Sequence, residues 1–374
     1  MKIANAAEDD WEILKGFFPV GWEALATEHH ATKGLRQDKS PEKLLQVLLM
    51  HLGCGFSLRE TATRAAQAGL SQLSDVALLK RLRKSKGWLQ AMCQVLWEER
   101  GARTKSPGPV PLRMVDSTLV KEPGKTGSQW RIHYSLQWPQ LKCDFFQISG
   151  TEGNGTGESL KGYPLKAGEY VIGDRGFCRG PGLHFAAACG ALTLVRLNTG
   201  SVKLQNSDRS PFPLLSRLGA LKKAGESREW TVWVPSGDAQ PLRMRLCAVR
   251  KSVASTRRSL KKLYRKASIN QRTPDPATLR YAEYVMVITT FPADKFCTTQ
   301  VLHYYRFRWQ IELLFKRLKQ LAQLGHLPKH DEESSHAWLY GKLLIALLTD
   351  KLIAHARDFS PWGFELAAKE QPVA

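Results

Sequence analysis

Three acidic residues stand where carboxylates could act together on metal ions. Asp116 follows the apolar run Arg-Met-Val, and Asp174 follows Tyr-Val-Ile-Gly. Each run indicates a buried strand, so both aspartates are expected near strand ends, at a common edge of a sheet. Glu312 lies in a long helical pattern. Three carboxylates form an oxygen-rich site suited to Mg²⁺ or Mn²⁺, and a pair of such ions can promote phosphoryl transfer.

The helix expected around Glu312 carries further polar side chains on one face. At about 100° per residue, four of them fall within an arc of about 60°: Tyr305, Arg308, Glu312 and Lys319. Apolar residues lie broadly opposite, so one face can pack while the other presents a carboxylate beside two cations and a phenol. An ordinary amphipathic helix with exposed ion pairs gives the same pattern. The two strand-end aspartates favour the catalytic interpretation.

The motifs around these residues carry a resemblance to a known family. The stretch from Tyr305 to Lys319 fits Tyr-x2-Arg-x3-Glu-x6-Lys, which resembles the signature of bacterial insertion-sequence DDE transposases of the IS-four-like group. Val-Asp-Ser-Thr around Asp116 and Gly-Asp-Arg-Gly-Phe around Asp174 resemble the group's other acidic motifs. The resemblance runs from about residue 110 to about residue 350. The group typically fills the long gap before the last acid with a β-rich insertion.

The resemblance implies a ribonuclease-H-like catalytic core and cut-and-paste transposition: metal-dependent cleavage at transposon ends, then attack of the freed 3′-OH on target DNA. It implies that two Mg²⁺ or Mn²⁺ ions are held by the catalytic residues Asp116, Asp174 and Glu312. Contacts to DNA phosphates near the transposon end are implied for Tyr305, Arg308 and Lys319. A homodimer that pairs two double-stranded ends is implied as well.

The chain departs from the group at one position. Some relatives cut through a hairpin intermediate and place a tryptophan from the insertion against a flipped base. The matching stretch is 284–292, where the nearest residue is Val285. Tyr284, Trp230 and Trp233 are alternatives for this role, and a different hairpin step is another. The departure concerns base flipping and leaves the acidic triad unaffected.

The charge balance predicts a polyanionic partner. The chain has 374 residues, with 55 Lys+Arg against 34 Asp+Glu and a formal net charge of +21. Nucleic acid and an anionic membrane surface are both candidates. No stretch approaches the roughly 18 apolar residues of a spanning helix, and the N-terminus lacks the pattern of a signal peptide. The basic residues are spread along the chain, which favours DNA and no membrane.

The cysteines indicate a reducing compartment. There are seven, and none forms a Cys-x-x-Cys pair, which disfavours a disulfide framework or a zinc finger. Scattered cysteines without an export signal fit a reducing cytoplasm. The resemblance implies that this is the bacterial cytoplasm and that the protein is associated with the nucleoid.

Residues 1–105 are predicted to form an all-α DNA-binding domain. A helix–turn–helix is expected over 57–85, with Gly69 in the turn and Ser74 or Asp75 capping the second helix. The cations of that second helix expected to contact DNA are Lys80, Arg81 and Lys84. A helical bundle with a solvated basic face is an equal alternative on pattern alone, and the net charge favours DNA.

A Pro- and Gly-rich linker is expected at 104–111. After it, the predicted secondary structure changes along the chain and divides it into further segments. Strands mixed with helices predict an α/β catalytic core over 106–199 and 285–356, including a helix from about 294 to 324 and another over 336–356. A β-rich insertion ending in a basic arm is predicted over 200–284, and 357–374 is a tail. Further DNA contacts are expected at Arg175, Arg258, Lys261 and Lys262. A solvated loop is an equal alternative for the arm.

Two other functions remain compatible with the sequence. The chain could be a DNA-binding protein that derives from a transposase and has lost catalysis, although the presence of all three acids argues against this. It could also be a nuclease of the same fold that cuts DNA without strand transfer. A basic membrane-surface protein is a third and weaker alternative.

Overall fold

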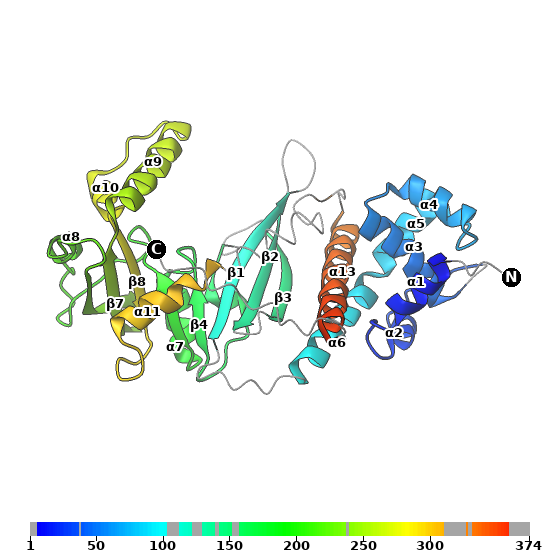
Figure 1. The fold of residues 1–374 in the computed structure, drawn as a ribbon, viewed down its shortest axis with the longest axis horizontal. Coiled ribbons are helices and arrows are strands. Elements are labelled where there is room, and N and C mark those ends of the chain that lie inside the picture. Colours follow the sequence, from blue (N-terminus) through cyan, green and yellow to red (C-terminus); the bar gives the residue numbers. More distant parts are fainter. Residues whose placement is uncertain are drawn as a thin grey trace. The chain divides into compact units, whose positions relative to one another are not determined.

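The computed structural model describes residues 6–36, 39–102, 112–121, 129–138, 142–151, 157–236, 239–309, 327 and 331–358. The chain divides into two compact units (Figure 1). The first, here called the helical unit, comprises Met1–Lys105, Val120–Ser128 and Arg317–Ala374. The second, here called the sheet unit, comprises Ser106–Leu119 and Gln129–Lys316.

The described elements of the helical unit are helices with recognisable starts. They are α1 (Ala6–Lys15), α2 (Trp22–Glu28), α3 (Pro41–Cys54), α4 (Leu58–Gln67), α5 (Asp75–Lys84), α6 (Lys86–Ala102) and α13 (Glu332–Asp358). Ser40 caps α3, and Ser74 caps α5 by accepting the N–H of Ala77 at 3.3 Å. Gly69 lies between α4 and α5 with φ at 66°. The predicted helix pair and its serine cap are therefore confirmed.

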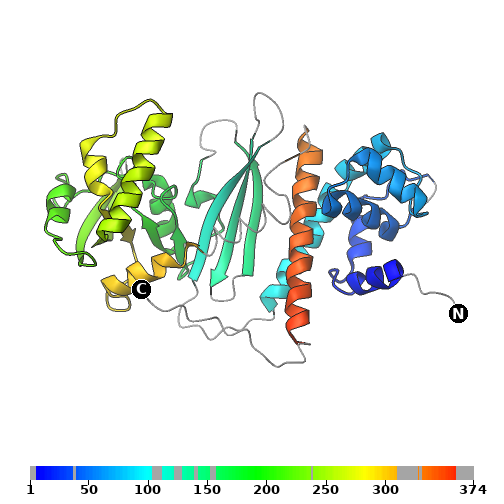
Figure 2. The ribbon, with the colours of Figure 1, turned by 45° about the horizontal axis from the view of Figure 1, so that its top comes forward.

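The last helix packs on the N-terminal helices. α13 contacts α6, α5 and α3, and Figures 1 and 2 show it lying along α6. Arg83 binds Asp331 through two hydrogen bonds of 3.1 and 2.9 Å, and Lys351 pairs with Glu99 at 3.0 Å. The sequence predicts this helix as part of the catalytic core, whereas in the structure it groups with the helical unit. An apolar stripe predicts that a helix packs, but it does not say on which partner.

A pH dependence follows from the Asp331 contacts. Burial raises the pKa of Asp331, but hydrogen bonds from Arg83 and Ser334 outweigh it and lower the pKa to about 2, from 3.8. The stabilisation is therefore present above about pH 4 and lost as the pH falls toward 2. We expect Asp331→Ala to lower the free energy of unfolding by about 1 kcal/mol at pH 7, because solvent screens this half-exposed pair. Urea unfolding followed by helical circular dichroism should show the difference shrinking between pH 4 and pH 2. A difference independent of pH would contradict this cause.

The described strands of the sheet unit form an eight-stranded sheet in the order β3-β2-β1-β4-β5-β8-β7-β6. The strands are β1 (Leu112–Lys121), β2 (Gln129–Trp138), β3 (Lys142–Gly150), β4 (Tyr170–Gly173), β5 (Leu192–Arg196), β6 (Ser227–Ser236), β7 (Ala239–Arg250) and β8 (Tyr284–Thr289). β1, β4 and β5 run parallel, whereas β2 and β3 pair antiparallel. This mixed α/β architecture is consistent with the ribonuclease-H-like core that was expected.

The segment 200–284 extends the same sheet. β7 pairs antiparallel with both β6 and β8, and β8 pairs with β5. The predicted antiparallel pair is therefore confirmed. The segment is less β-rich than predicted, because it also contains three helices, which are α8 (Leu214–Gly219), α9 (Val253–Ile269) and α10 (Pro276–Tyr281). The basic arm is α9, whose half-buried positions include Leu260, Leu263 and Ala267 at helical spacing.

Two helices position the site against the sheet. α7 (Gly180–Ala188) contacts β5 and β6, and α11 (Thr298–Arg306) contacts β7, β6 and β5. Leu183 of α7 belongs to a buried cluster that includes Val171, Val195 and Ile288 of the central strands. β4 and β5 are therefore closely packed against α7, and this packing fixes the position of the strand end that Asp174 follows.

A buried arginine joins β1 to the neighbouring loop. Arg113 is 6% exposed, and its guanidinium donates to Asp144 at 2.7 Å, to Glu169 at 3.1 Å and to the carbonyl of Pro164 at 2.9 Å. Ser135 donates to the other oxygen of Asp144. Such a pair is tolerated in the interior because both acids and the guanidinium have several hydrogen-bond partners.

Candidate active site

Asp116 and Asp174 lie beside each other where β4 ends. The parallel pairing of β1 with β4 places Met114 opposite Ile172, and the same register two residues further places Asp116 opposite Asp174. Asp174 follows the end of β4 as predicted, whereas Asp116 lies within β1, which continues beyond it. The expectation that Asp116 lies near the end of a strand is therefore wrong. The two aspartates are still neighbours, because the register of β1 and β4 places them opposite each other. β1 continues past this point, whereas β4 ends before it.

Each aspartate is held by its own backbone turn. Oδ1 of Asp116 accepts the N–H of Ser117 at 2.8 Å, and Oδ1 of Asp174 accepts the N–H of Gly176 at 2.7 Å. The hydroxyl of Tyr163 donates to the carbonyl of Asp116 at 2.6 Å. No donor from the described part of the chain reaches either Oδ2. One oxygen on each carboxylate therefore remains available to a ligand.

Negative charge accumulates at this point. Burial raises the pKa of Asp116 to about 7, and the charges of Asp174 and Glu158 add to the effect, whereas the N–H of Ser117 and the cation of Arg308 oppose it. A nearby divalent cation would stabilise the charged form of the carboxylate. The unused oxygens therefore fit a hard, oxygen-binding ion such as Mg²⁺ or Mn²⁺.

The third predicted ligand cannot be added from the structure. Glu312 and Lys319 lie outside the described residues. Within those residues, no group of three His, Cys, Asp or Glu side chains is arranged to hold a metal ion. The structure thus brings together the two aspartates and leaves the position of Glu312 a prediction.

Tyr305 and Arg308 lie close to the aspartates. Arg308 acts on the pKa of Asp116, and Asp174 acts on the pKa of Tyr305. The guanidinium carbon of Arg308 lies 5.7 Å from the ring centre of Tyr305. Burial raises the pKa of Tyr305 to about 12, so its hydroxyl stays protonated at neutral pH and can donate a hydrogen bond.

α11, which carries Tyr305, begins later and ends earlier than the helix predicted from 294 to 324. α11 begins at Thr298 and ends at Arg306, so Arg308 lies in a turn just after it. The N–H groups of Phe307 and Arg308 bond to carbonyls three residues back, at 3.1 and 3.3 Å. This tighter turn ends α11 within the helix that was expected from 294 to 324, and residues 310–324 lie outside the described part of the chain. Tyr305 and Arg308 stay on the same side, because side chains three residues apart eclipse in such a turn.

An ion pair in the sheet fixes the start of α11. Arg245 binds Glu229 through two hydrogen bonds of 2.7 and 2.6 Å, and it also donates to the carbonyls of Phe291 and Phe296. Thr298 donates to the same Glu229 at 2.7 Å. These contacts hold the loop before α11 on β6 and β7, and they thereby position Tyr305.

Glu158 and Arg131 are not among the residues that the sequence predicts for the site. The sequence of 151–159 indicates only a polar, glycine-rich loop, yet the structure places Glu158 against both aspartate turns. Ser117 donates to Glu158 at 3.0 Å, and Arg131 approaches Glu158 at 3.6 Å. An acid within a glycine-rich loop between the two Asp motifs was the available signal. Its contacts could not be inferred, because the loop has no periodicity.

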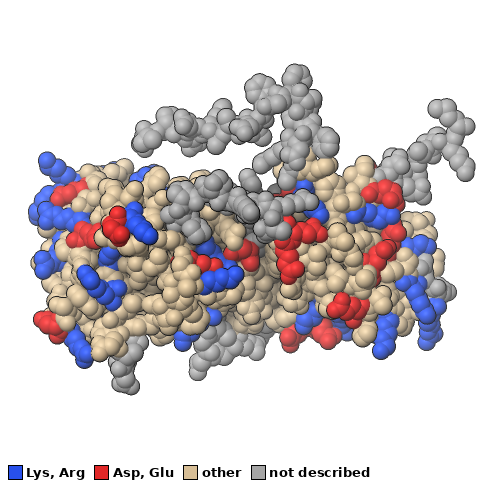
Figure 3. All heavy atoms as spheres, turned by 90° about the horizontal axis from the view of Figure 1, so that it is seen from below, with Lys and Arg blue, Asp and Glu red and all other residues tan. Residues whose placement is uncertain are grey.

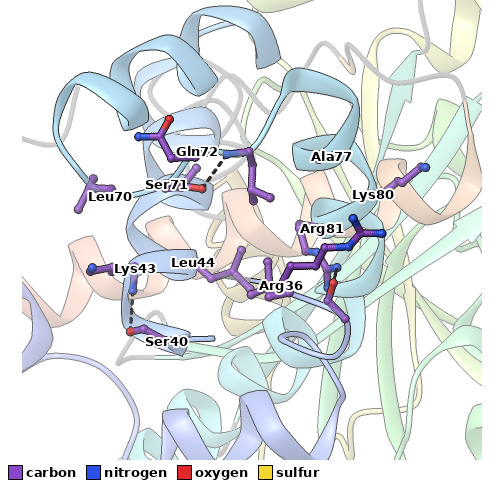
Figure 4. A pocket seen from close by; sticks show the side chains of 14 residues that line it. Arg36, Ser40, Lys43, Leu44, Leu70, Ser71, Gln72, Ala77, Lys80 and Arg81 are labelled. Carbon is purple, nitrogen blue, oxygen red and sulfur yellow. Dashed lines mark hydrogen bonds between the residues drawn. The ribbon is translucent and has the colours of Figure 1, made fainter. Parts of the chain in front are cut away.

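The predicted DNA-binding cations of α5 differ in their surroundings. Lys80 and Lys84 are exposed, whereas Arg81 is 9% exposed and donates to the carbonyls of Lys33 and Gly34 at 2.7 Å each. Arg81 thus holds a loop against α5. A pocket of about 490 Å³ lies beside this contact. Arg36 and Lys80 are among the lining side chains drawn in Figure 4.

The other predicted contacts lie on the sheet unit. Three of the cations of α9 were predicted to contact DNA, and all three are exposed: Arg258, Lys261 and Lys262. No residue of α9 is fully buried. Arg175 is exposed beside Asp174, and it donates to Asn198 at 3.4 Å. On the face drawn in Figure 3, Lys and Arg are interspersed with Asp and Glu and do not form one uninterrupted patch. DNA contact by these cations remains a prediction.

The candidates for a base-stacking residue are all partly or wholly covered. Tyr284 is 3% exposed within β8, and Val285 is paired with Val249 of β7. Trp230 packs against the buried cluster, and Trp233 is half-buried on the same strand. Tyr284 could meet a base only if the sheet opened, so it is the least suitable of the three alternatives.

The described helices include none that is both long enough and apolar enough to span a membrane.

Comparisons with known proteins identify the family. The family described as "Transposase DDE domain" matches residues 141–348. A transposase of insertion sequence element IS186A from Escherichia coli strain K12 is 32% identical over 368 residues, which cover 96% of this chain and 97% of the relative. The Escherichia coli transposase of IS421 is 32% identical over 369 residues, with the same coverage of both chains. That of IS231F from Bacillus thuringiensis subsp. israelensis is 28% identical, over 52% of this chain and 43% of the relative. This chain belongs to the DDE-domain transposase family of insertion sequences.

Proposed function

We propose that this chain is a DNA transposase that cleaves at transposon ends and joins the freed 3′-OH to target DNA. The observation that carries the proposal is the adjacent placement of Asp116 and Asp174, each with one carboxylate oxygen that no donor from the described residues reaches. The relatives are named as transposases of insertion sequences, and family membership implies a DNA-cleaving enzyme that depends on a divalent metal.

The chemistry divides between metal and protein. Two Mg²⁺ or Mn²⁺ ions, when bound, activate the attacking oxygen and stabilise the leaving one. Asp116, Asp174 and the predicted Glu312 hold them. Arg308 binds the scissile phosphate, for which the planar guanidinium is suited. Tyr305 donates a hydrogen bond from its protonated hydroxyl to a DNA phosphate near the transposon end.

DNA binding is proposed for two surfaces. The α4–α5 pair is the candidate helix–turn–helix, with Lys80 and Lys84 facing the duplex, and α9 supplies a second basic surface. Arg175 and Lys319 are proposed to contact phosphates near the cut. We also propose that the active complex is a homodimer that holds two transposon ends, and that it acts on the DNA of the nucleoid.

A joining assay tests the function. Purified protein is incubated with Mg²⁺, a duplex that ends in the element's terminal repeat, and a supercoiled plasmid. We expect cleavage at the repeat and covalent joining of its 3′-OH end to the plasmid. Cleavage without joining would identify a nuclease, and binding without cleavage would identify an inactive DNA-binding protein. Either result would reject the proposal.

The α9 surface gives a second prediction. Replacing Arg258, Lys261 and Lys262 together with alanine removes three exposed cations. We expect weaker DNA binding and a slope of log K against log salt that is smaller by about three, because each lost phosphate contact changes the slope by about 0.9. Fluorescence anisotropy at several salt concentrations measures both. Replacing Lys222 and Lys223, which are exposed cations outside α9, is the control. Equal losses per charge removed would mean that net charge, and not the α9 surface, is responsible.

A further inference from the structure

We infer that Glu158 is a positioning residue that joins the turns of Asp116 and Asp174. The inference rests on the proposed function, because it assigns a role within the same site. The sequence motifs of the two aspartates do not include Glu158, which comes from the loop after β3. Its carboxylate nevertheless contacts both motifs.

The first contact is on the Asp116 side. The N–H of Ser117 holds Oδ1 of Asp116, and the hydroxyl of Ser117 donates to Oε1 of Glu158 at 3.0 Å. The same hydroxyl accepts a hydrogen bond from Nη1 of Arg131 at 3.0 Å. A hydroxyl has one proton, so a cation on one side and an anion on the other fix its orientation. Glu158 therefore constrains the residue whose backbone orients Asp116.

The second contact is on the Asp174 side. The N–H of Gly176 holds Oδ1 of Asp174 at 2.7 Å. A Cβ placed on Gly176 would overlap Oε2 of Glu158, so the carboxylate lies directly against this glycine. Gly176 is not among the residues with positive φ. Space for Glu158, and not backbone conformation, is therefore what requires glycine here.

The surroundings of Glu158 distinguish it from the two aspartates. Oε1 is engaged by Ser117 and faces Arg131 at 3.6 Å, and Oε2 is covered by Gly176. Asp116 and Asp174 each keep one oxygen without a donor from the described residues. Glu158 is thus arranged to hold the turns at Ser117 and Gly176, whereas the two aspartates are arranged to bind a metal ion. Residues that orient metal ligands in this way typically contribute about 10–100-fold to metal affinity or activity.

The test uses the full chain and four variants: Glu158→Ala, Glu158→Gln, Gly176→Ala and the double variant Glu158→Ala/Gly176→Ala. Mn²⁺ affinity is measured without DNA, from the electron paramagnetic resonance signal of the free ion. Cleavage rate, DNA affinity and thermal unfolding are measured alongside. Glu283→Ala is the matched control, because Glu283 is also a partly buried glutamate paired with an arginine.

We expect Glu158→Ala to weaken Mn²⁺ binding and to slow cleavage by about tenfold or more, with DNA affinity unchanged. Glu158→Gln keeps an acceptor for the hydroxyl of Ser117, so it should retain most of the Mn²⁺ affinity and most of the cleavage rate. Gly176→Ala should resemble Glu158→Ala, because its methyl group displaces the carboxylate. In the double variant the methyl group occupies vacated space, so the two effects should not add.

Three results would overturn the inference. The first is Mn²⁺ affinity and cleavage within twofold of wild type for folded Glu158→Ala. The second is loss of Mn²⁺ binding in Glu158→Gln as complete as in Asp116→Asn, which would make Glu158 a direct ligand. The third is additive effects of Gly176→Ala and Glu158→Ala. If Glu158→Ala does not fold, the Mn²⁺ affinities and cleavage rates of Glu158→Gln and Gly176→Ala decide whether the inference holds. A wild-type protein that neither binds Mn²⁺ nor cleaves would instead reject the proposed function, and the inference with it.

Discussion

Replacing Asp116 or Asp174 with asparagine is expected to reduce strand cleavage by about a thousandfold or more, while DNA binding stays within about twofold. Asparagine keeps the size of the side chain and an oxygen for the backbone N–H that each Oδ1 accepts. It removes the charge that holds the metal. Glu312→Gln should have the same effect if Glu312 is the third ligand.

The measurement is single-turnover cleavage of a labelled transposon end in Mg²⁺ and in Mn²⁺. Anisotropy on the same duplex reports binding. Asp208→Asn is a suitable control, because Asp208 is an exposed acid of the same unit whose contacts are local ones to Ser210. Full cleavage by any one of the three variants would remove that residue from the triad. A parallel loss of DNA binding would point to misfolding.

The second large effect concerns stability. Arg113→Met is expected to lower the free energy of unfolding of the sheet unit by about 3–5 kcal/mol, because it leaves Asp144 and Glu169 without their shared cation in a buried setting. Methionine retains most of the apolar stem, so lost packing contributes little. Urea unfolding at pH 7, followed by tryptophan fluorescence, measures the change.

Two comparisons isolate the buried charge as the cause. Arg250→Met removes an arginine that also donates to two carbonyls and pairs with Glu283, but its side chain is 32% exposed. We expect that change to cost about 1 kcal/mol. Adding Asp144→Asn and Glu169→Gln to Arg113→Met should recover part of the loss. Equal costs for Arg113→Met and Arg250→Met would show that burial is not the deciding factor.

Local patterns predicted the strands of the core well. The apolar runs before Asp116 and Asp174 and the run 284–292 correspond to β1, β4 and β8. Each is a short run whose residues are buried in the sheet, so composition alone marks it. The serine cap of α5 was equally readable, since a single side chain satisfies the exposed N–H groups of the first turn.

Features that depend on partners distant in the sequence were not readable. Asp116 was expected at a strand end, because the apolar run stops there, but β1 continues past it. The basic arm was not recognised as a helix, because few apolar residues mark the inner face of α9. Glu158 belongs to the site through contacts with Ser117 in β1 and with Gly176 in the turn after β4, and these two residues come from distant parts of the sequence.

The placement of α13 has a consequence for the order in which the protein can mature. The helical unit is completed by residues from both ends of the chain, with the whole sheet unit encoded between them. During synthesis, α3, α5 and α6 therefore leave the ribosome long before the helix that covers them. A chain interrupted before residue 332 would expose the apolar surface that α13 normally covers. The helical end of such a fragment would be prone to aggregation, so shortened copies of the protein are not expected to accumulate in folded form beside the intact chain.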